Sequence, residues 1–159
     1  MLREILSWMP VLPAVVLVVS DFRLRTVPVA ALVAFGGLAV ASALSATSVG
    51  EVLRRTGQNA LLLAYLGSGC CLYLSLRYRR RINLLRGYFG TGDVCFLLAL
   101  SPLLPFREYL YFLVGGCALT LCGWAAYRGL GGCRDTIPLA GTLGILFILH
   151  IAMTNLWLR

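Results

Sequence analysis

Long apolar stretches alternate with short polar connections along the whole chain. Each stretch approaches the roughly 20 residues that a helix needs to cross a hydrocarbon core about 30 Å thick. We therefore predict an all-α, polytopic membrane protein, built as a bundle of six transmembrane helices. The predicted spans are Leu2–Ser20, Val27–Ala46, Ala60–Leu76, Tyr88–Phe106, Tyr109–Tyr127 and Ile137–Leu158.

The first stretch, Leu2–Ser20, has the weakest pattern because two charged residues and two prolines interrupt it. Val18-Val19-Ser20 would also be an acceptable cleavage site, so a removable signal peptide is the alternative to a retained span. Arg23 and Arg25 follow directly and would resist translocation, and a second apolar stretch begins just after them. These positions favour retention of the first stretch as a membrane span.

Composition supports a membrane protein without adding a second domain. The 159 residues are 60% hydrophobic, and the mean hydropathy is +0.87, which is typical of integral membrane proteins. The connections are too short to hold a soluble domain, so residues 1–159 are predicted to form a single membrane-embedded domain. The lipid bilayer is thus one expected partner.

The formal net charge of +8 has a simple origin, because all 14 basic residues are arginines near the ends of the predicted spans. A nucleic-acid partner is therefore not predicted. If the spans alternate in direction, nine arginines share one side with Asp21 and Asp93, and the positive-inside rule makes that side cytoplasmic, with both termini outside. The nine arginines on the cytoplasmic side are Arg23, Arg25, Arg77, Arg79, Arg80, Arg81, Arg86, Arg128 and Arg134, and the other five are Arg3, Arg54, Arg55, Arg107 and Arg159.

The longest connection, Arg77–Gly87, carries five arginines. It is either a topology anchor or a surface for anionic lipid headgroups.

The six cysteines show no C-x-x-C pairs, and the chain has a single histidine. Zinc sites combine several such ligands at short spacings, so neither a metal ion nor another cofactor is predicted. Most of the cysteines lie inside predicted spans, where cysteine acts as a small apolar residue. No disulfide framework is predicted.

Asp93 is the most informative residue, because it follows Gly90-Thr91-Gly92 inside an otherwise uncharged apolar stretch. A carboxylate at membrane depth costs at least about 2.5 kcal/mol and is a candidate functional residue for that reason. Gly90 and Gly92 allow backbone angles that other residues resist, and irregular backbone at this depth persists only where protein or water covers it. We therefore predict that Asp93 opens the fourth helix and faces a water-filled cleft. The N-terminal end of a helix is positive and favours the negative charge of this carboxylate.

Asp21 closes the first apolar stretch on the same predicted side as Asp93. Two carboxylates that lie close together in a low dielectric cannot both ionise, so one remains protonated. Such a pair can hydrolyse an amide, because the ionised group takes a proton from water while the protonated group polarises the carbonyl. The alternative is that each aspartate simply pairs with a nearby arginine, such as Arg23, Arg25 or Arg86. The sequence alone does not show that the two aspartates meet.

The order of these motifs resembles the type IV prepilin peptidase family over nearly the whole chain. The segment from Asp21 to Pro28 resembles the first catalytic motif, and Gly90-Thr91-Gly92-Asp93-Val94 resembles the second, G-x-G-D followed by an aliphatic residue. Ile137-Pro138 fits the late proline motif of the family. A lone G-x-G-D is moderately specific, whereas the ordered set on six spans is fairly specific.

The resemblance implies an aspartic-type endopeptidase of the bacterial inner membrane with its active site facing the cytoplasm. It would cleave the leader peptides of type IV prepilins or pseudopilins, the expected protein partners. Asp21 and Asp93 would be the catalytic pair, with Gly90 and Gly92 as backbone support. The paired C-x-x-C motifs of the methyltransferase region found in many bacterial members are missing, which implies a peptidase-only form.

Two positions depart from the family pattern: Val29 stands where asparagine is frequent, and Cys95 stands where lysine is frequent. They leave open a catalytically inactive homologue. A second alternative is a non-enzymatic membrane scaffold or transport subunit, in which His150 and Asn155 of the last span would line a proton or solute path. The oligomeric state and the particular pilin substrate are not predicted.

Overall fold

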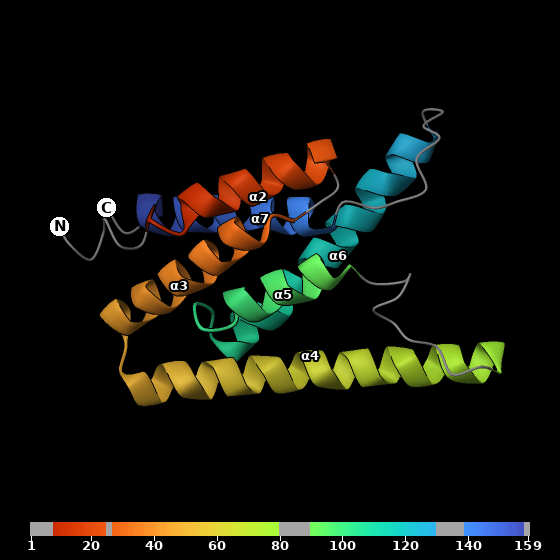
Figure 1. The fold of residues 1–159 in the computed structure, drawn as a ribbon, viewed down its shortest axis with the longest axis horizontal. Helices are drawn as coiled ribbons and strands as arrows, with labels where there is room; N and C mark the ends of the chain where they lie inside the picture. Colours follow the sequence, from red (N-terminus) through yellow and green to blue (C-terminus); the bar gives the residue numbers. More distant parts are fainter. Residues whose placement is uncertain (1–7, 25–26, 80–89, 130–138, 158–159) are drawn as a thin grey trace.

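The computed structural model describes residues 8–24, 27–79, 90–129 and 139–157, the side chains of the last three excepted. Over these ranges the chain forms six helices and no strand, which confirms the all-α fold class. Successive helices alternate in direction (Figure 1), with the N-terminal ends of α3, α5 and α7 facing the same way as the C-terminal ends of α2, α4 and α6. The helices are α2 (Val11–Leu24), α3 (Val29–Ala46), α4 (Val49–Tyr78), α5 (Thr91–Leu100), α6 (Phe106–Gly129) and α7 (Leu139–Trp157).

Three of these helices, α3, α4 and α6, are long and apolar enough to cross a membrane. Of the six predicted spans, three therefore correspond to described helices whose length and composition allow them to cross a membrane. With 14 residues, α2 is about 21 Å long at 1.5 Å per residue, and α5, with 10, is about 15 Å long. The last helix, α7, has 19 residues and is therefore about 28 Å long.

The predicted span Tyr88–Phe106 is wrong at its C-terminal end, because α5 stops at Leu100 and a turn leads directly into α6. Short helices leave carbonyl groups without helical partners, and at membrane depth such groups need other donors. Tyr109 Oη donates to the Leu97 carbonyl at 3.0 Å, and Asn59 Nδ2 donates to the Ser101 and Leu104 carbonyls, each at 2.9 Å. Side chains from α4 and α6 thus stabilise the end of α5.

The predicted span Ala60–Leu76 is only part of α4, which begins at Val49 and includes charged residues. Ser48 caps this helix, since its side chain accepts a hydrogen bond from the Glu51 amide at 3.4 Å. Glu51 also forms ion pairs with Arg54 at 2.9 Å and Arg55 at 2.8 Å. Because these charges partner one another along one helix face, the helix extends past the apolar stretch.

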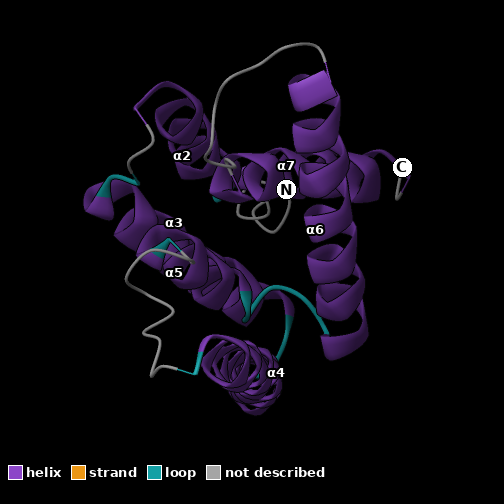
Figure 2. Cartoon of the chain, turned by 90° about the vertical axis from the view of Figure 1, so that its right-hand side faces the viewer, coloured by secondary structure: helices purple, strands orange, loops and turns teal. Residues whose placement is uncertain are grey.

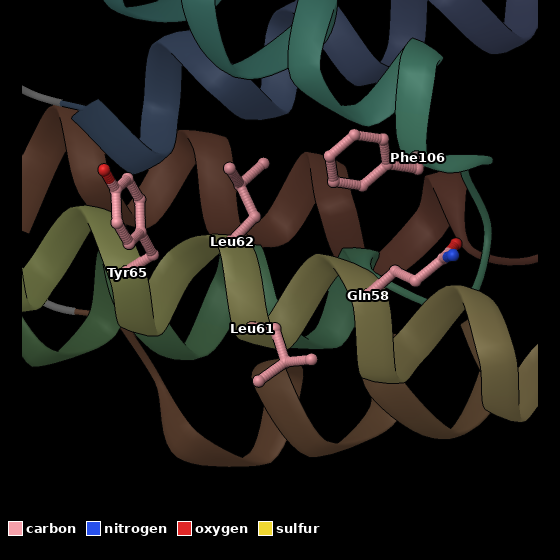
Figure 3. A pocket seen from close by; sticks show the side chains of 5 residues that line it. All are labelled: Gln58, Leu61, Leu62, Tyr65 and Phe106. Carbon is pink, nitrogen blue, oxygen red and sulfur yellow. The ribbon is translucent and has the colours of Figure 1, made fainter.

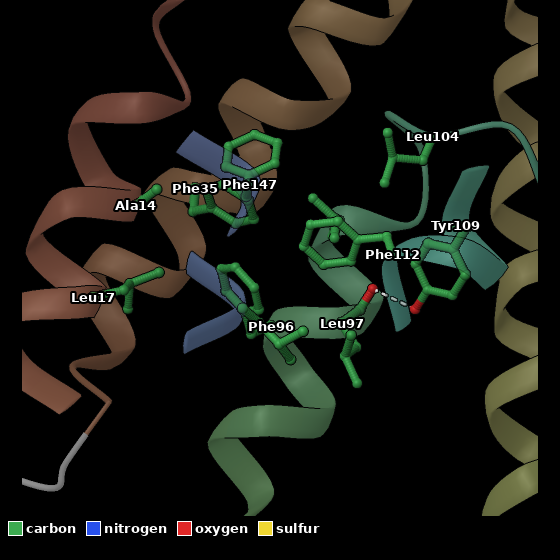
Figure 4. Packing of buried hydrophobic residues seen from close by; sticks show 11 residues of the cluster. Ala14, Leu17, Phe35, Phe96, Leu97, Leu104, Tyr109, Phe112 and Phe147 are labelled. Atoms are coloured by element: carbon green, nitrogen blue, oxygen red, sulfur yellow. Dashed lines mark hydrogen bonds between the residues drawn. The ribbon is translucent and has the colours of Figure 1, made fainter. Parts of the chain in front are cut away.

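The core lies where α2, α3, α5 and α7 meet, and aromatic rings occupy its centre (Figure 4). The rings of Phe35 and Phe96 stack with centroids 5.0 Å apart, and Phe147 meets Phe35 edge-on at 5.3 Å. By contrast, α4 lies along one side of the bundle (Figure 2) and buries only Val52 and Asn59. The core therefore fixes the helices that carry the two aspartates, while α4 contributes Asn59 and the partly buried Leu62 and Leu63.

Candidate active site

The structure brings Asp21 of α2 and Asp93 of α5 to the same place, the first turn of α7. The Gly141 amide donates to Asp21 Oδ2 at 2.6 Å, and the Ala140 amide donates to Asp93 Oδ1 at 3.0 Å. Because these amides belong to consecutive residues, standard bond lengths keep their nitrogens within about 4 Å of each other. The two carboxyl groups are therefore held at neighbouring positions of one helix turn.

The Ala140 and Gly141 amides lie in the first described turn of α7, which runs from Leu139 to Trp157. The first N–H groups of a helix have no carbonyl partner within it, and the aligned peptide dipoles make that end favourable for anions. Both donors are buried in the protein. The start of α7 thus supplies two fixed donors and a positive potential to a pair of acids.

Asp21 lies within α2, which continues to Leu24, and the residue is 8% exposed. Two glycines of α7 let α2 approach closely enough for this contact. A Cβ at Gly144 would overlap the Val18 side chain, and a Cβ at Gly141 would lie 3.0 Å from Asp21 Oδ2. Close packing of small residues is a common way to bring membrane helices together, and here it places the carboxylate against the backbone of α7.

Asp93 lies in the first turn of α5, as the sequence predicts, and is half-buried. Gly90 has an ordinary φ of −66°, so the predicted use of unusual backbone angles is not seen there. Its lack of a side chain is what matters, since a Cβ would lie 2.8 Å from Asp93 Oδ2. At Gly92, a Cβ would lie 2.6 Å from Cγ2 of Val27. Both glycines therefore provide room, the first for the carboxylate and the second for the chain that enters α3.

Within the parts of the chain that the structure describes, neither carboxylate forms an ion pair with an arginine. Arg23, one of the partners considered from the sequence, is exposed. The other two, Arg25 and Arg86, lie outside the described residues. Backbone amides, rather than arginine side chains, are the partners that the structure gives to this pair.

The remaining sequence candidates are not brought to the pair. His150 is half-buried in α7, more than two turns from Gly141 along the helix, and the Asn155 side chain is not described. Val29 and Cys95, the positions that depart from the family pattern, are both exposed. The late motif Ile137-Pro138 and most of the basic connection lie outside the described residues. No group of three His, Cys, Asp or Glu residues that could hold a metal ion occurs in the described ranges.

One groove in the described part of the chain lies away from the position where a cleft beside Asp93 is predicted. A shallow groove of about 390 Å³ lies between α4 and the start of α6 (Figure 3), and no residue of α2, α5 or α7 lines it. Its walls are mostly apolar, as expected for a surface that faces lipid. The groove is therefore separate from the carboxylate pair. Its lining residues are Gln58, Leu61, Leu62, Tyr65 and Phe106.

The arrangement can supply an acid and a base at one point. Two carboxyl groups on adjacent donors repel each other when both are charged, so a state with one of them protonated is the one suited to acid–base chemistry. A water molecule activated by the ionised group and a carbonyl polarised by the protonated group would then react without a metal ion.

No protein-family model matches the chain, and neither does any curated protein or solved structure.

Proposed function

We propose that this chain is a membrane aspartic endopeptidase that removes the leader peptide of type IV prepilins or pseudopilins. The observation that carries the proposal is the convergence of Asp21 and Asp93 on consecutive amides of α7. The two acids come from the positions that resemble the two catalytic motifs of the prepilin peptidase family. A scaffold has no need for two carboxylates at one point, since burying like charges together is unfavourable.

In the proposed mechanism, the ionised carboxylate removes a proton from water, whose oxygen attacks the scissile carbonyl carbon. The protonated partner donates a hydrogen bond to the carbonyl oxygen and stabilises its developing charge. Collapse of the tetrahedral intermediate breaks the C–N bond, and a carboxyl group returns the proton to the departing amine. The two aspartates titrate as a pair, so the ionised state at the start of the cycle belongs to the pair rather than to one residue.

We further propose that all six helices are embedded in the bacterial inner membrane, with the acid pair at the cytoplasmic face. The short helices α2 and α5 would be covered by the longer ones and by lipid rather than each crossing alone. Four described arginines lie toward the end of the bundle that carries the pair, against three toward the other end, and the positive-inside rule makes the first end cytoplasmic. The four are Arg23, Arg77, Arg79 and Arg128, and the three are Arg54, Arg55 and Arg107.

The test is cleavage of a prepilin encoded by the same organism, using purified protein in detergent or liposomes. Asp21→Asn and Asp93→Asn should each abolish cleavage, and the double variant should be no worse, because residues that act as one unit are not additive. Glu108→Gln is the matched control, since Glu108 is exposed at the start of α6 and remote from the pair.

Each result has a distinct meaning. Full activity in Asp93→Asn would refute the aspartic mechanism. A wild-type protein that cuts no candidate prepilin, although it is folded and membrane-inserted, would refute the proposed peptidase and favour an inactive homologue or a scaffold.

A further inference from the structure

Gly141 lies directly against Asp21 of the proposed catalytic pair. Its amide holds Asp21, and its Cα faces the Phe22 ring as well as the carboxylate. A Cβ at this position would lie 2.7 Å and 2.9 Å from two ring carbons of Phe22 and 3.0 Å from Asp21 Oδ2. Real Cβ atoms essentially never approach other atoms closer than 3.0 Å, so a side chain here requires something to move.

The group that moves must belong to α2, since both neighbours of the added Cβ are consecutive residues of that helix. Phe22 is 43% exposed and has room to turn, whereas Asp21 is only 8% exposed. A shift of the backbone at Phe22 would nevertheless carry the Asp21 carboxyl group with it. The position of Asp21 therefore depends on the absence of a side chain at Gly141.

We propose that the first turn of α7 positions the two acids, with the Gly141 and Ala140 amides as one donor for each carboxyl group. The inference rests on the proposed peptidase function and adds residues that no catalytic motif includes. Both donors are backbone N–H groups, so neither titrates or changes rotamer during the reaction. Gly141 is a positioning residue, because it acts on the chemistry only through Asp21.

The first test is Gly141→Ala in the prepilin cleavage assay. A displacement of about 1 Å at a reacting group can lower the rate by roughly a hundredfold, so kcat should fall by about that factor. KM should change little, because Gly141 acts on the chemistry only through Asp21. Gly37→Ala is the matched control, since a Cβ at Gly37 meets nothing within 4 Å, and it should keep the wild-type kcat.

Rescue separates positioning from general damage to the fold. Phe22→Ala removes the ring that a Cβ at position 141 would strike first, so the double variant Gly141→Ala with Phe22→Ala should recover most of the lost kcat. Phe22→Ala alone provides the reference rate. Equal kcat in Gly141→Ala and the wild type would overturn the proposal, and so would a double variant no faster than Gly141→Ala.

A second variant removes a donor without adding an atom. Incorporating lactic acid in place of Ala140 turns its amide into an ester, which deletes only the N–H that donates to Asp93. The kcat should again fall while KM is retained. Because this variant adds no bulk, it still tests the proposal if Gly141→Ala does not fold.

Infrared difference spectroscopy tests the same contact without a substrate. The chain has six acidic residues, so the carboxyl band of Asp93 can be identified as the one that Asp93→Asn removes. That band should shift in the Ala140 ester variant, and an unshifted band would overturn the positioning role. If the wild type cuts no prepilin but the band shifts, the proposed function fails while the structural contact stands.

Discussion

Asn59→Ala should destabilise the fold more than alanine substitution of an exposed residue of α4, because the Asn59 side chain joins α4 to the end of α5. Asn59 is fully buried and donates to the carbonyls of Ser101 and Leu104, both at 2.9 Å. Its own Oδ1 has no partner in the structure. The substitution therefore removes two hydrogen bonds and leaves two carbonyls unpaired, but it also removes one unsatisfied acceptor.

The magnitude follows from these three contributions. Leaving a buried acceptor unpaired costs about 1–3 kcal/mol, whereas hydrogen bonds between membrane helices average about 0.6 kcal/mol and reach about 1.7 kcal/mol. Two lost bonds, offset by removal of the unsatisfied Oδ1, give an expected loss of about 2 kcal/mol in the free energy of unfolding. The assay is reversible unfolding in mixed micelles by increasing the fraction of sodium dodecyl sulfate, followed by circular dichroism.

Two further variants separate hydrogen bonding from loss of volume. Asn59→Asp keeps the shape of the side chain but replaces the donor by oxygen atoms that face two carbonyls, so it should be at least as destabilising as alanine. Gln58→Ala changes the exposed neighbour of Asn59 and should stay within about 0.5 kcal/mol of the wild type. A wild-type unfolding midpoint for Asn59→Asp would refute the role assigned to these hydrogen bonds.

Three other outcomes are expected. Tyr109→Phe removes the other donor to α5 and should lower the free energy of unfolding by about 1 kcal/mol in the same assay; an unchanged midpoint would contradict this. Gly92→Ala should lower both stability and cleavage, because its Cβ would lie 2.6 Å from the Val27 side chain, and activity equal to the wild type would show that the helices adjust freely. With the native cysteines replaced, Arg54→Cys should react with an impermeant maleimide added to intact cells, whereas Arg128→Cys should be protected. The reverse labelling pattern would overturn the proposed orientation.

The local sequence was sufficient to predict that the helices form and that α5 begins near Asp93. Apolar length predicted α3 to within two residues at its start, and its end, Ala46, was predicted correctly. The glycines before Asp93 correctly indicated that a helix begins there. Alternation of the spans placed Asp21 and Asp93 on one side, and the structure brings them to the same turn. The start and end of a helix depend mostly on residues that are neighbours in the chain, so the sequence pattern can predict them.

The errors arise where distant groups decide the outcome. Hydropathy excluded the start of α4 because Glu51 and its arginine partners are charged, yet those charges satisfy one another. The end of α5 was missed because Asn59 and Tyr109, on other helices, provide its donors. Gly141 was missed because a backbone amide is common to almost every residue and leaves no signature in the sequence.

The parts that meet at the acid pair are translated in a definite order. Asp21 emerges from the ribosome first, Asp93 follows several helices later, and the amides of α7 come after both. A nascent chain that has not yet inserted α7 holds both acids without the donors that bring them together. The site is therefore expected to assemble only when α7 packs against α2, so that an interrupted or prematurely released chain is inert even though it contains both aspartates.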